Sequence, residues 1–429
     1  MLSERHIVVG ICGSISAYKS LYLIRRLRDL GASIAPVMTQ SACQFITPLS
    51  VSVLANCEAV TSLWQTSQSI GDASRVGHVE LSHKAELMVI APATADCLAR
   101  LVIGRADDAL CALALSTQAP LLVVPAMESG MWEHPATQQN VQTLRARGVF
   151  VLTPESGFLA SGRMGVGRMA EPEIIIKHIQ RMLSPQDLEG ENVVVTAGAT
   201  RESLDPARFL SNRSTGKMGF ALAEEAWRRG ASVHLIAGPV ALTMFEEGSR
   251  DDGKGACMTV SRVETTQEML EACQKAVDLS SIFMMAAAPV DFTPHERSHV
   301  KIKKDRADAY IETIWQTTWD ATPDILKTLR ARTPARWVVG FAAESHDLES
   351  YARKKLLEKD LDMIVANDIS RHDAGFATDT NAVSIFKRDG SVVHLETCSK
   401  VKIAQSIWDE VVCSRKLRHA AGHVTSQNY

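Results

Sequence analysis

Residues 7–38 read IVVGICGSISAYKSLYLIRRLRDLGASIAPVM, and this stretch decides the fold class. It predicts an apolar strand over Ile7–Ile11, a helix that ends at Gly31, and a second strand over Ser33–Met38. A strand, a helix, a glycine and a second strand together form the βαβ unit of a parallel sheet covered by helices. We therefore expect the chain to begin with an α/β domain.

The same order of elements returns in the second half of the chain. We expect a strand over Asn192–Ala197, a helix from Lys217 to Arg229, and a strand over Ser232–Ala237. Residues 186–190, which read QDLEG, are polar and turn-rich, as a linker should be. The sequence thus predicts an α/β protein with two Rossmann-like, doubly wound domains. The predicted bounds are 1–185 for the first domain, 186–190 for the linker, 191–415 for the second domain and 416–429 for a polar tail.

Other apolar runs extend the two predicted sheets. The dipeptide Asp389-Gly390 between two of these runs indicates a β-hairpin, and Lys400–Val412 indicates a closing amphipathic helix with a frayed end after it. The additional strands are expected at Ala85–Ile90, Leu121–Val124, Ile282–Ala288, Trp337–Ala342, Met363–Ala366, Ala382–Phe386 and Ser391–Leu395.

Composition and charge exclude several classes of protein. The chain has 429 residues, of which 46% are hydrophobic and 22% charged, a balance that excludes intrinsic disorder, collagen and coiled coils. Lys and Arg number 46 against 49 Asp and Glu, so the net charge is −3. This near-neutral balance predicts no binding to nucleic acid or to a membrane surface.

The cysteines and the apolar stretches indicate in which cellular compartment the protein is expected. The nine cysteines are scattered and none forms a Cys-x-x-Cys pair, which favours reduced thiols in the cytoplasm over disulfides or zinc. The first residues lack the layout of a signal peptide. The uncharged stretch 109–127 is interrupted by polar residues and proline, so it predicts a helix over 109–117 and a strand over 121–126 rather than a membrane span.

Small and hydroxyl-bearing residues follow the first predicted strands. Because ligands of open parallel sheets bind at the carboxyl ends of strands, these loops are candidates for a phosphorylated ligand. The same residues would serve equally well as helix caps and packing residues, so both interpretations stay open. The turn after the first strand is not Gly-x-Gly-x-x-Gly, which argues against a nicotinamide cofactor.

Six motifs of the first half resemble the flavin-dependent cysteine decarboxylases. They are GICGSISAYK (10–19), GHVEL (77–81), APATAD (91–96), PAM (125–127), MW (131–132) and GVGRM (165–169). The resemblance implies that FMN binds between subunits of a homo-oligomer and oxidises the thiol of a cysteine-derived substrate, whose carboxylate then leaves as CO₂. The same flavin then reduces the enethiol product, and a protein cysteine supplies a proton.

The resemblance also assigns residues. His78 matches the essential histidine of the family, and an imidazole can accept a proton at neutral pH. The positions expected to contact FMN are Gly13, Ser14, Ser16, Thr39, Ser41, Ala93, Thr94 and Met127.

Two positions depart from the family pattern. Glu128 stands where the family has an asparagine that holds the substrate carboxylate, and Ser161 stands where it has the proton-donating cysteine. Two negative charges about 4 Å apart repel by about 4 kcal/mol at an effective dielectric constant of about 20. A serine hydroxyl is also a far weaker acid than a thiol. We therefore expect FMN binding to persist and decarboxylation to be weak unless Glu128 is protonated or displaced.

The second half contains SNRSTGKMG at residues 211–219, at the start of a predicted helix. Hydroxyls, an amide and a lysine at a helix N-terminus can bind an anion. A capped helix with a lysine on the surface would have the same sequence pattern. The motif is not a Walker A sequence, because the glycine-to-lysine spacing differs.

The second half resembles the phosphopantothenate–cysteine ligases, and the two resemblances follow the domain order of the bifunctional coenzyme A biosynthesis family over about residues 1–412. The other motifs that carry it are Ala286–Ala288, Asp291, Lys301–Lys304, Pro323–Ile325, Gly340–Glu344, Lys355, Lys359 and Ala366–Asp368. This resemblance implies that CTP activates the carboxylate of 4′-phosphopantothenate as an acyl-cytidylate. The amine of cysteine then attacks the activated carbon.

Phosphate chemistry of this kind needs cations, and Mg²⁺ is expected to bridge the phosphates, with ligands that the sequence leaves unknown. By resemblance, Asn212 and Lys301 are the catalytic candidates. The expected CTP contacts are Met285, Ala286, Ala287, Asp291, Lys301, Pro323, Asp324, Ile325, Leu326, Phe341, Lys355 and Lys359.

Two interpretations of function remain. The chain is either a complete bifunctional enzyme or a ligase whose flavin-binding domain is catalytically impaired and holds an oligomer together. A nicotinamide oxidoreductase, the third possibility, lacks its fingerprint.

Overall fold

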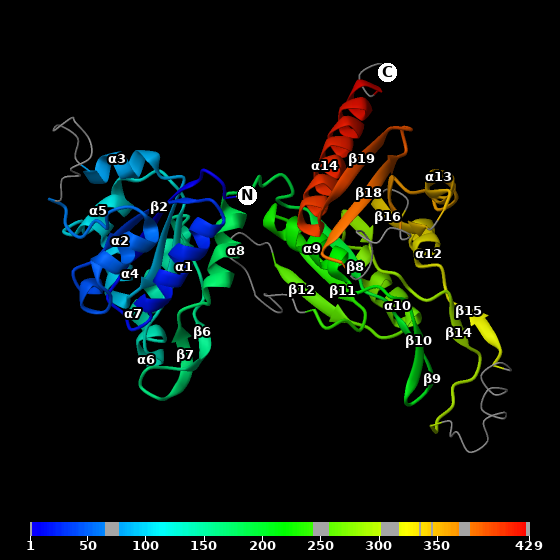
Figure 1. The fold of residues 1–429 in the computed structure, drawn as a ribbon, viewed down its shortest axis with the longest axis horizontal. Helices are drawn as coiled ribbons and strands as arrows, with labels where there is room; N and C mark the ends of the chain where they lie inside the picture. The colour runs from blue at the N-terminus through cyan, green and yellow to red at the C-terminus, as the bar shows by residue number, and fades with distance from the viewer. Residues whose placement is uncertain are drawn as a thin grey trace. The chain divides into compact units, whose positions relative to one another are not determined.

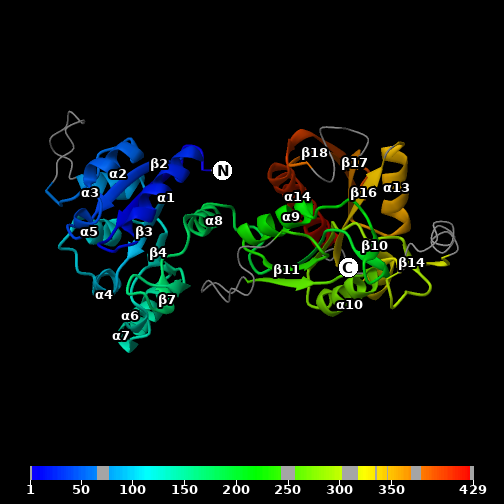
Figure 2. The ribbon, with the colours of Figure 1, turned by 60° about the horizontal axis from the view of Figure 1, so that its bottom comes forward.

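The computed structural model describes residues 2–64, 77–242, 257–301, 317–333, 336–344, 346–368 and 378–425, with the backbone alone for 77–79 and 419–425. The chain divides into two compact units, one running up to Ser184 and the other beginning at Pro185 (Figure 1). Each unit contains a largely parallel sheet with helices on both faces, which confirms the predicted fold class (Figure 2).

The first unit is built on a five-stranded parallel sheet. Its strand order is β2-β1-β3-β4-β5, so the first strand lies between the second and the third. The strands are β1 (His6–Ile11), β2 (Ser33–Met38), β3 (Leu87–Ala93), β4 (Leu121–Pro125) and β5 (Phe150–Val151). The change in direction of the strand order beside β1 places the loops after β1 and β3 next to each other, where ligands of such sheets bind.

Side chains that alternate along β1 pack into two hydrophobic cores, one on each face of the sheet. Val9 packs with residues of α1, α2 and α8, whereas Val8 packs with residues of α4, α5 and α7. The sheet is therefore covered on both faces, as its continuous apolar strands require. The helical elements are α1 (Ala17–Asp29), η1 (Ala42–Gln44), α2 (Pro48–Ala55), α3 (Gly77–Lys84), α4 (Ala95–Ile103), α5 (Ala109–Ser116), α6 (Ser129–Trp132), α7 (Pro135–Ala146) and α8 (Pro172–Met182), and β6 (Glu155–Phe158) pairs with β7 (Met164–Arg168) in a separate hairpin.

The second unit contains an eight-stranded sheet in the order β12-β11-β8-β13-β16-β17-β18-β19. The first six strands are parallel, and the last two form an antiparallel hairpin at the edge. The strands are β8 (Asn192–Ala197), β11 (Ser232–Ala237), β12 (Met258–Arg262), β13 (Ile282–Met285), β16 (Trp337–Glu344), β17 (Met363–Asp368), β18 (Thr380–Lys387) and β19 (Val392–Ser399). Two small hairpins, β9 (Arg201–Asp205) with β10 (Arg208–Ser211) and β14 (Phe292–Pro294) with β15 (Trp319–Ala321), lie outside this sheet.

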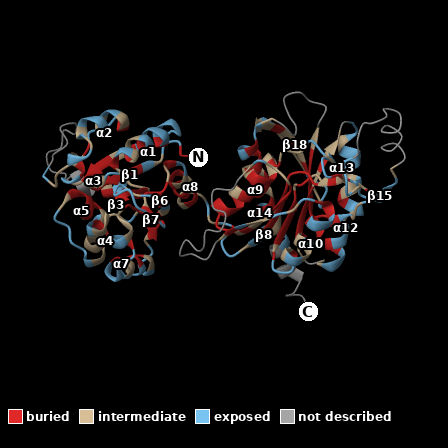
Figure 3. Ribbon diagram, turned by 90° about the horizontal axis from the view of Figure 1, so that it is seen from below, coloured by how far each residue is buried: buried red, intermediate tan, exposed pale blue. Residues whose placement is uncertain are grey.

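Helices cover the eight-stranded sheet on both faces, and burial in Figure 3 is concentrated in its strands. Val193 and Val195 of β8 pack with α9 (Lys217–Arg228) and α14 (Lys400–Thr425). Val194, between them, packs with the helices of the opposite face. Those helices are α10 (Thr266–Val277), α12 (Ile325–Arg332) and α13 (Leu348–Glu358).

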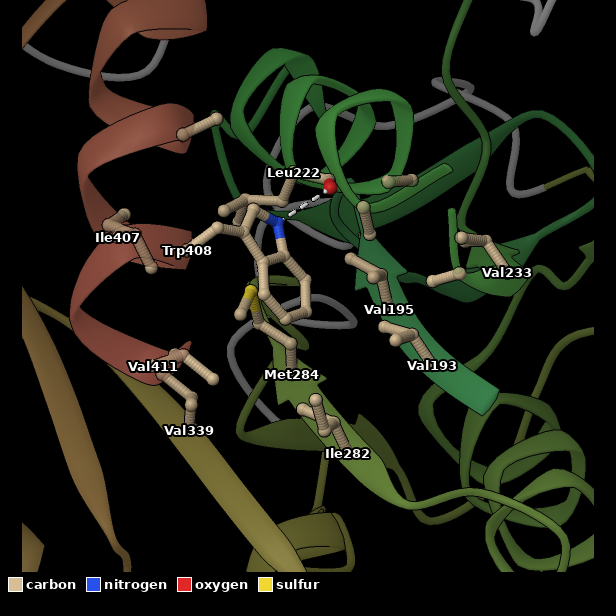
Figure 4. Packing of buried hydrophobic residues seen from close by; sticks show 14 of the residues in the cluster. Val193, Val195, Leu222, Val233, Ile282, Met284, Val339, Ile407, Trp408 and Val411 are labelled. Atoms are coloured by element: carbon tan, nitrogen blue, oxygen red, sulfur yellow. Dashed lines mark hydrogen bonds between the residues drawn. The ribbon is translucent and has the colours of Figure 1, made fainter. Parts of the chain in front are cut away.

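Trp408 joins helix α14 to helix α9. Its side chain is fully buried, and its indole Nε1 donates a hydrogen bond to the carbonyl oxygen of Leu222 at 2.9 Å (Figure 4). A buried indole needs such a partner, because an unsatisfied N–H costs free energy in an apolar core.

Two expectations for the secondary structure of the second half need correction, one for a strand and one for the tail. The strand at Ile282 ends at Met285 and not at Ala288, because the N–H of Ala288 bonds the carbonyl oxygen of Gly198 in the loop after β8. Residues of the expected linker contact the second unit, since Leu188 is buried in its core. Asp187 also pairs with Arg229, with Oδ1 2.7 Å from Nε.

The segment expected as a polar tail is helical as far as Thr425. Two arginines near the end of α14 explain the longer helix. Arg415 pairs with Glu191 at 2.9 Å and Arg418 pairs with Asp362 at 3.0 Å, so polar residues anchor this part of the helix to the sheet.

We predict that Trp408→Ala lowers the free energy of unfolding of the second unit by about 3–5 kcal/mol, because it leaves a cavity in the core and removes the hydrogen bond to Leu222. Leu417→Ala, on the same helix but 64% exposed, should change it by no more than about 0.5 kcal/mol. Calorimetric melting of both variants measures the difference. Equal melting transitions would show that α14 does not hold the core together.

Candidate functional site

A cavity of about 800 Å³ opens at the carboxyl end of the eight-stranded sheet. This volume is typical of sites for small molecules. Its walls are formed by the residues after strands β10 and β13, the end of β16, the first residues of α9, α12 and α14, and residues of α13 and its C-cap. Eleven of the twelve expected CTP contacts line it: Met285, Ala286, Ala287, Asp291, Pro323, Asp324, Ile325, Leu326, Phe341, Lys355 and Lys359.

Hydrogen bonds between adjacent loops fix the floor of the cavity. The buried hydroxyl of Thr196 accepts a bond from the backbone N–H of Ala287 at 3.1 Å. The backbone N–H of Ala288 donates to the carbonyl oxygen of Gly198 at 2.8 Å. The alanine loop after β13 is therefore held against the loop after β8, and its backbone has little freedom to move.

Asn212 connects a third loop to this floor. Its amide nitrogen donates to the carbonyl oxygens of Ala288 at 3.1 Å and Pro289 at 2.8 Å. Both amide protons are used by these bonds, so the side chain has a defined position beside the alanine loop.

The glycine after the lysine of the SNRSTGKMG motif lets helix α9 approach the sheet. A Cβ atom on Gly219 would lie 2.5 Å from Cβ of Ala197 and 2.7 Å from the carbonyl oxygen of Thr196. Any larger residue would push the start of α9 away from β8, so this glycine sets the width of the cavity at its floor.

Two lysines face the cavity from α13 and its C-cap, each beside a carboxylate. Lys355 pairs with Glu344 at 2.7 Å, and Lys359 pairs with Asp324 at 3.1 Å. Asp324 also caps helix α12, since its side chain accepts a bond from the N–H of Lys327. These partners hold the ammonium groups in place until a phosphate can compete for them.

Lys301 does not line the cavity. It is exposed, follows the β14 segment, and is the last described residue before a stretch that lies outside the described residues. The structure therefore brings Asn212 but not Lys301 to the site that the sequence predicted for them.

In the first unit, the expected cofactor contacts gather at the carboxyl end of the five-stranded sheet. A Cβ atom on Gly13 would lie 2.5 Å from Cβ of Ser41, so the loops after β1 and β2 touch. Ser16 sits at the N-cap of α1 without a side-chain bond to the helix. The loop closes on itself instead, since the N–H groups of Ala17 and Lys19 donate to the carbonyl oxygens of Ser14 and Ser16, both at 3.0 Å. The Ser16 hydroxyl, which caps no N–H group, remains a candidate contact for a phosphorylated cofactor at the positive end of α1.

Two other hydroxyls at this edge accept backbone hydrogen bonds. Thr94 caps α4 and accepts from the N–H of Cys97 at 3.2 Å, whereas Thr39 accepts from the N–H of Ala42 at 3.2 Å in the turn before η1. The capping interpretation therefore holds for Thr94, although a hydroxyl that accepts a bond still has its proton to donate. His78 lies in the first turn of α3, and its side chain is outside the described residues.

The two positions that depart from the decarboxylase pattern are in contact. Ser161, in the turn between β6 and β7, donates from its hydroxyl to Oε1 of Glu128 at 3.1 Å. The hairpin also bonds the loop of Glu128 directly, since the N–H of Met127 donates to the carbonyl oxygen of Gly167 at 3.0 Å. Sequence reasoning treated the two changes as separate, but the structure makes them one pair.

Comparison with known proteins connects both units to one family. The family model for the DNA/pantothenate metabolism flavoprotein C-terminal domain matches residues 188–414, and the Flavoprotein model matches 1–184. The coenzyme A biosynthesis bifunctional protein CoaBC of Bacillus subtilis is 39% identical, with 97% of this chain and 98% of that protein covered. The Haemophilus influenzae protein of the same name is 41% identical, with 96% of this chain and 98% of that protein covered. The chain belongs to the CoaBC family.

Two solved structures are similar to parts of the chain. A crystal structure of the C-terminal domain of CoaBC is 34% identical, covers 54% of this chain and 98% of its own, and has a TM-score of 0.43. A cysteine-to-serine mutant of PPC decarboxylase complexed with pantothenoylaminoethenethiol is 30% identical, covers 41% of this chain and 97% of its own, and has a TM-score of 0.37.

The cavity is also lined by residues outside the expected CTP contacts. Lys217, Asn381 and Lys400 line the ligase-type cavity of this CoaBC chain. Lys217 was visible in a motif, but Lys400 and Asn381 come from the last strands and helix, where no local pattern indicates a ligand.

None of the described helices is both long and apolar enough to cross a bilayer.

We predict that Asn212→Asp slows ligation about 100-fold, because a carboxylate in that place would face the carbonyl oxygens of Ala288 and Pro289 instead of donating to them. Asn192→Asp, at the amino end of β8, is the matched control and should ligate at the unaltered rate. Steady-state rates of pyrophosphate release measure both. An Asn212→Asp variant with unchanged rates would place the reacting groups elsewhere.

Proposed function

We propose that the chain catalyses two successive steps of coenzyme A biosynthesis. The second unit ligates 4′-phosphopantothenate with cysteine at the expense of CTP, and the first unit decarboxylates the product to 4′-phosphopantetheine with FMN. The observation that carries this proposal is the similarity to CoaBC proteins along 96–97% of the chain, which includes both units. The cavity at the end of the larger sheet supplies a place for the ligation.

The ligation needs two bond exchanges. A carboxylate oxygen of phosphopantothenate bonds to the α-phosphorus of CTP, and the bond from that phosphorus to pyrophosphate breaks. The amine of cysteine then bonds to the acyl carbon, loses a proton, and displaces CMP. Negative charge collects on the phosphates in the first exchange, so fixed cations around them should stabilise the transition state.

Residues of the cavity can be given roles in this chemistry. We propose that Lys355 and Lys359 stabilise the phosphates of CTP, and that Phe341 and Leu326 contact its base. Among the described residues, no group of three carboxylate, histidine or cysteine side chains could hold a metal by itself. We therefore propose that Mg²⁺ is held mainly by the phosphates of CTP, with Asp291 beside them.

Lys301 remains a proposed catalytic residue on the strength of its motif alone. We predict that Lys301→Gln reduces ligation about 100- to 1,000-fold, because a preorganised cation near a reacting phosphate is typically worth that much. The melting temperature should not change, since Lys301 is exposed. A variant that ligates at the unaltered rate would remove Lys301 from the mechanism and would leave the cavity assignment intact.

The residues of the first unit fit FMN at the carboxyl end of the smaller sheet. When bound there, FMN supplies the redox chemistry that oxidises the substrate thiol and later reduces the product. We propose that Gly13, Ser14 and Ser16 hold its phosphate in the loop before α1, with Thr39, Ser41, Ala93, Thr94 and Met127 around the rest. We propose His78 as the group that accepts a proton from the substrate.

The Glu128–Ser161 pair favours a second interpretation, in which the flavin-binding unit has lost much of its activity and supports an oligomer. Glu128 places a carboxylate where the substrate carboxylate is expected, and Ser161 has no acidic proton to give. We expect the unaltered chain to accumulate phosphopantothenoylcysteine and to form phosphopantetheine slowly.

Product analysis by mass spectrometry tests this expectation. The chain is supplied with FMN, Mg²⁺, CTP, cysteine and phosphopantothenate, and the variants are Glu128→Asn, Ser161→Cys and both together. We expect the double variant to form phosphopantetheine at least about tenfold faster than the unaltered chain, and Glu128→Asn alone to accumulate the enethiol. Equal rates in all four proteins would mean that the pair does not limit decarboxylation.

We further propose a homo-oligomer in the cytoplasm. Tyr18 and Leu49 are 60% and 73% exposed on α1 and α2, which is consistent with a subunit contact near the proposed flavin site. All nine cysteines are free thiols, as is usual in a reducing compartment.

A further inference from the structure

Two lysines from distant parts of the sequence meet at one wall of the ligase cavity. Lys217 is the first residue of α9 and Lys400 is the first residue of α14. The two helices pack side by side on the same face of the sheet, through residues such as Leu222 and Trp408 (Figure 4). Their first residues therefore reach the carboxyl end of the sheet together.

A second pair of lysines, Lys355 and Lys359, lines the cavity from the other side of the sheet. Lys355 lies in α13 and Lys359 is its C-cap. The buried residues Ala352 and Leu356 of this helix pack on the opposite face of the sheet from α9 and α14. The cavity thus has one pair of lysines on each side of the sheet edge. The floor with Asn212 and the alanine loop lies between them.

The environment of Lys400 is unusual for a lysine. Only 6% of the residue is exposed, and Nζ donates to the carbonyl oxygen of Thr378 at 2.6 Å. Burial, and then the positive charge of Lys217, lower the pKa of Lys400 to about 8. Lysines are rarely buried to this extent.

The carboxylate beside the two lysines is largely outside the protein. Asp379 pairs with Lys217 at 2.6 Å and also acts electrostatically on Lys400, but its side chain is 88% exposed. An exposed carboxylate is a weak and easily displaced partner for an ammonium group. Asn381, which is 5% exposed, adds a buried amide to the same wall.

We propose that Lys217 and Lys400 bind the 4′-phosphate of phosphopantothenate. This proposal rests on the proposed ligase function and adds the residues that select a phosphorylated acid. The reaction must bring two polyanions together, and their phosphates repel each other unless separate cations hold them. With the triphosphate at Lys355 and Lys359 and the phosphate monoester at Lys217 and Lys400, the acid carboxylate and the α-phosphorus can meet over the floor between them.

Calorimetric binding to the full chain tests the proposal with three ligands: phosphopantothenate, pantothenate and CTP. Pantothenate lacks only the phosphate, so it reports on every contact except the proposed one. We expect the unaltered chain to prefer phosphopantothenate, and Lys400→Gln and Lys217→Gln each to weaken its binding about 10- to 100-fold. The affinities of both variants for pantothenate and CTP should stay within about twofold of those of the unaltered chain. This result would also show that the variants are folded.

Two further variants serve as controls. Lys402→Gln removes an exposed lysine from the same first turn of α14 and should leave all three affinities unchanged. Lys400→Arg keeps the positive charge and should retain most of the preference for the phosphorylated acid.

Three results would overturn the proposal. The first is an unaltered chain without preference for phosphopantothenate over pantothenate. The second is a loss of CTP affinity in both glutamine variants with the acid affinities unchanged, which would assign the lysines to the triphosphate. The third is unchanged binding of all ligands. Failure of the ligase function itself would appear differently, as an unaltered chain that binds these ligands and forms no phosphopantothenoylcysteine.

Discussion

The cavity of the second unit depends on hydrogen bonds between two loops that leave the centre of the sheet. Thr196 and Gly198, at the end of β8, accept bonds from the backbone of Ala287 and Ala288, beyond the end of β13. Parallel strands end at the same edge, so their loops can meet there, and these bonds decide how they meet. Without them the alanine loop would be free, Asn212 would lose its carbonyl partners, and the two lysine walls would face an undefined floor.

Apolar runs and glycine stops were enough to predict the architecture. The strands at Ser33–Met38, Asn192–Ala197 and Ser232–Ala237 have the predicted bounds because a strand buried on both faces must be apolar throughout. The same rule failed at Ile282–Ala288, since alanines are apolar in a loop as well as in a strand, and only the bonds to the neighbouring loop show where β13 ends. The length of α14 was missed because ion pairs to distant residues hold its polar end.

The candidate site was predictable where a local motif carries it and not elsewhere. Asn212 and Lys217 stand in a compact motif, whereas Lys400 joins them only through the packing of α14 on α9. The Glu128–Ser161 contact was likewise not predictable from local motifs. Each residue departs from a family pattern in its own segment, but only the folded hairpin shows that the hydroxyl of one bonds the carboxylate of the other. A substitution at either position therefore changes the surroundings of both.

The central claim is that the second unit activates a carboxylate at the α-phosphorus of CTP. The most direct measurement is a single turnover with phosphopantothenate whose carboxylate carries isotopically heavy oxygen, followed by mass spectrometry of the nucleotide and phosphate products. If the carboxylate attacks the α-phosphorus, one heavy oxygen will appear in CMP and none in pyrophosphate. Heavy oxygen in inorganic phosphate, accompanied by CDP, would contradict the account, because it would show that the acid was activated at the terminal phosphorus.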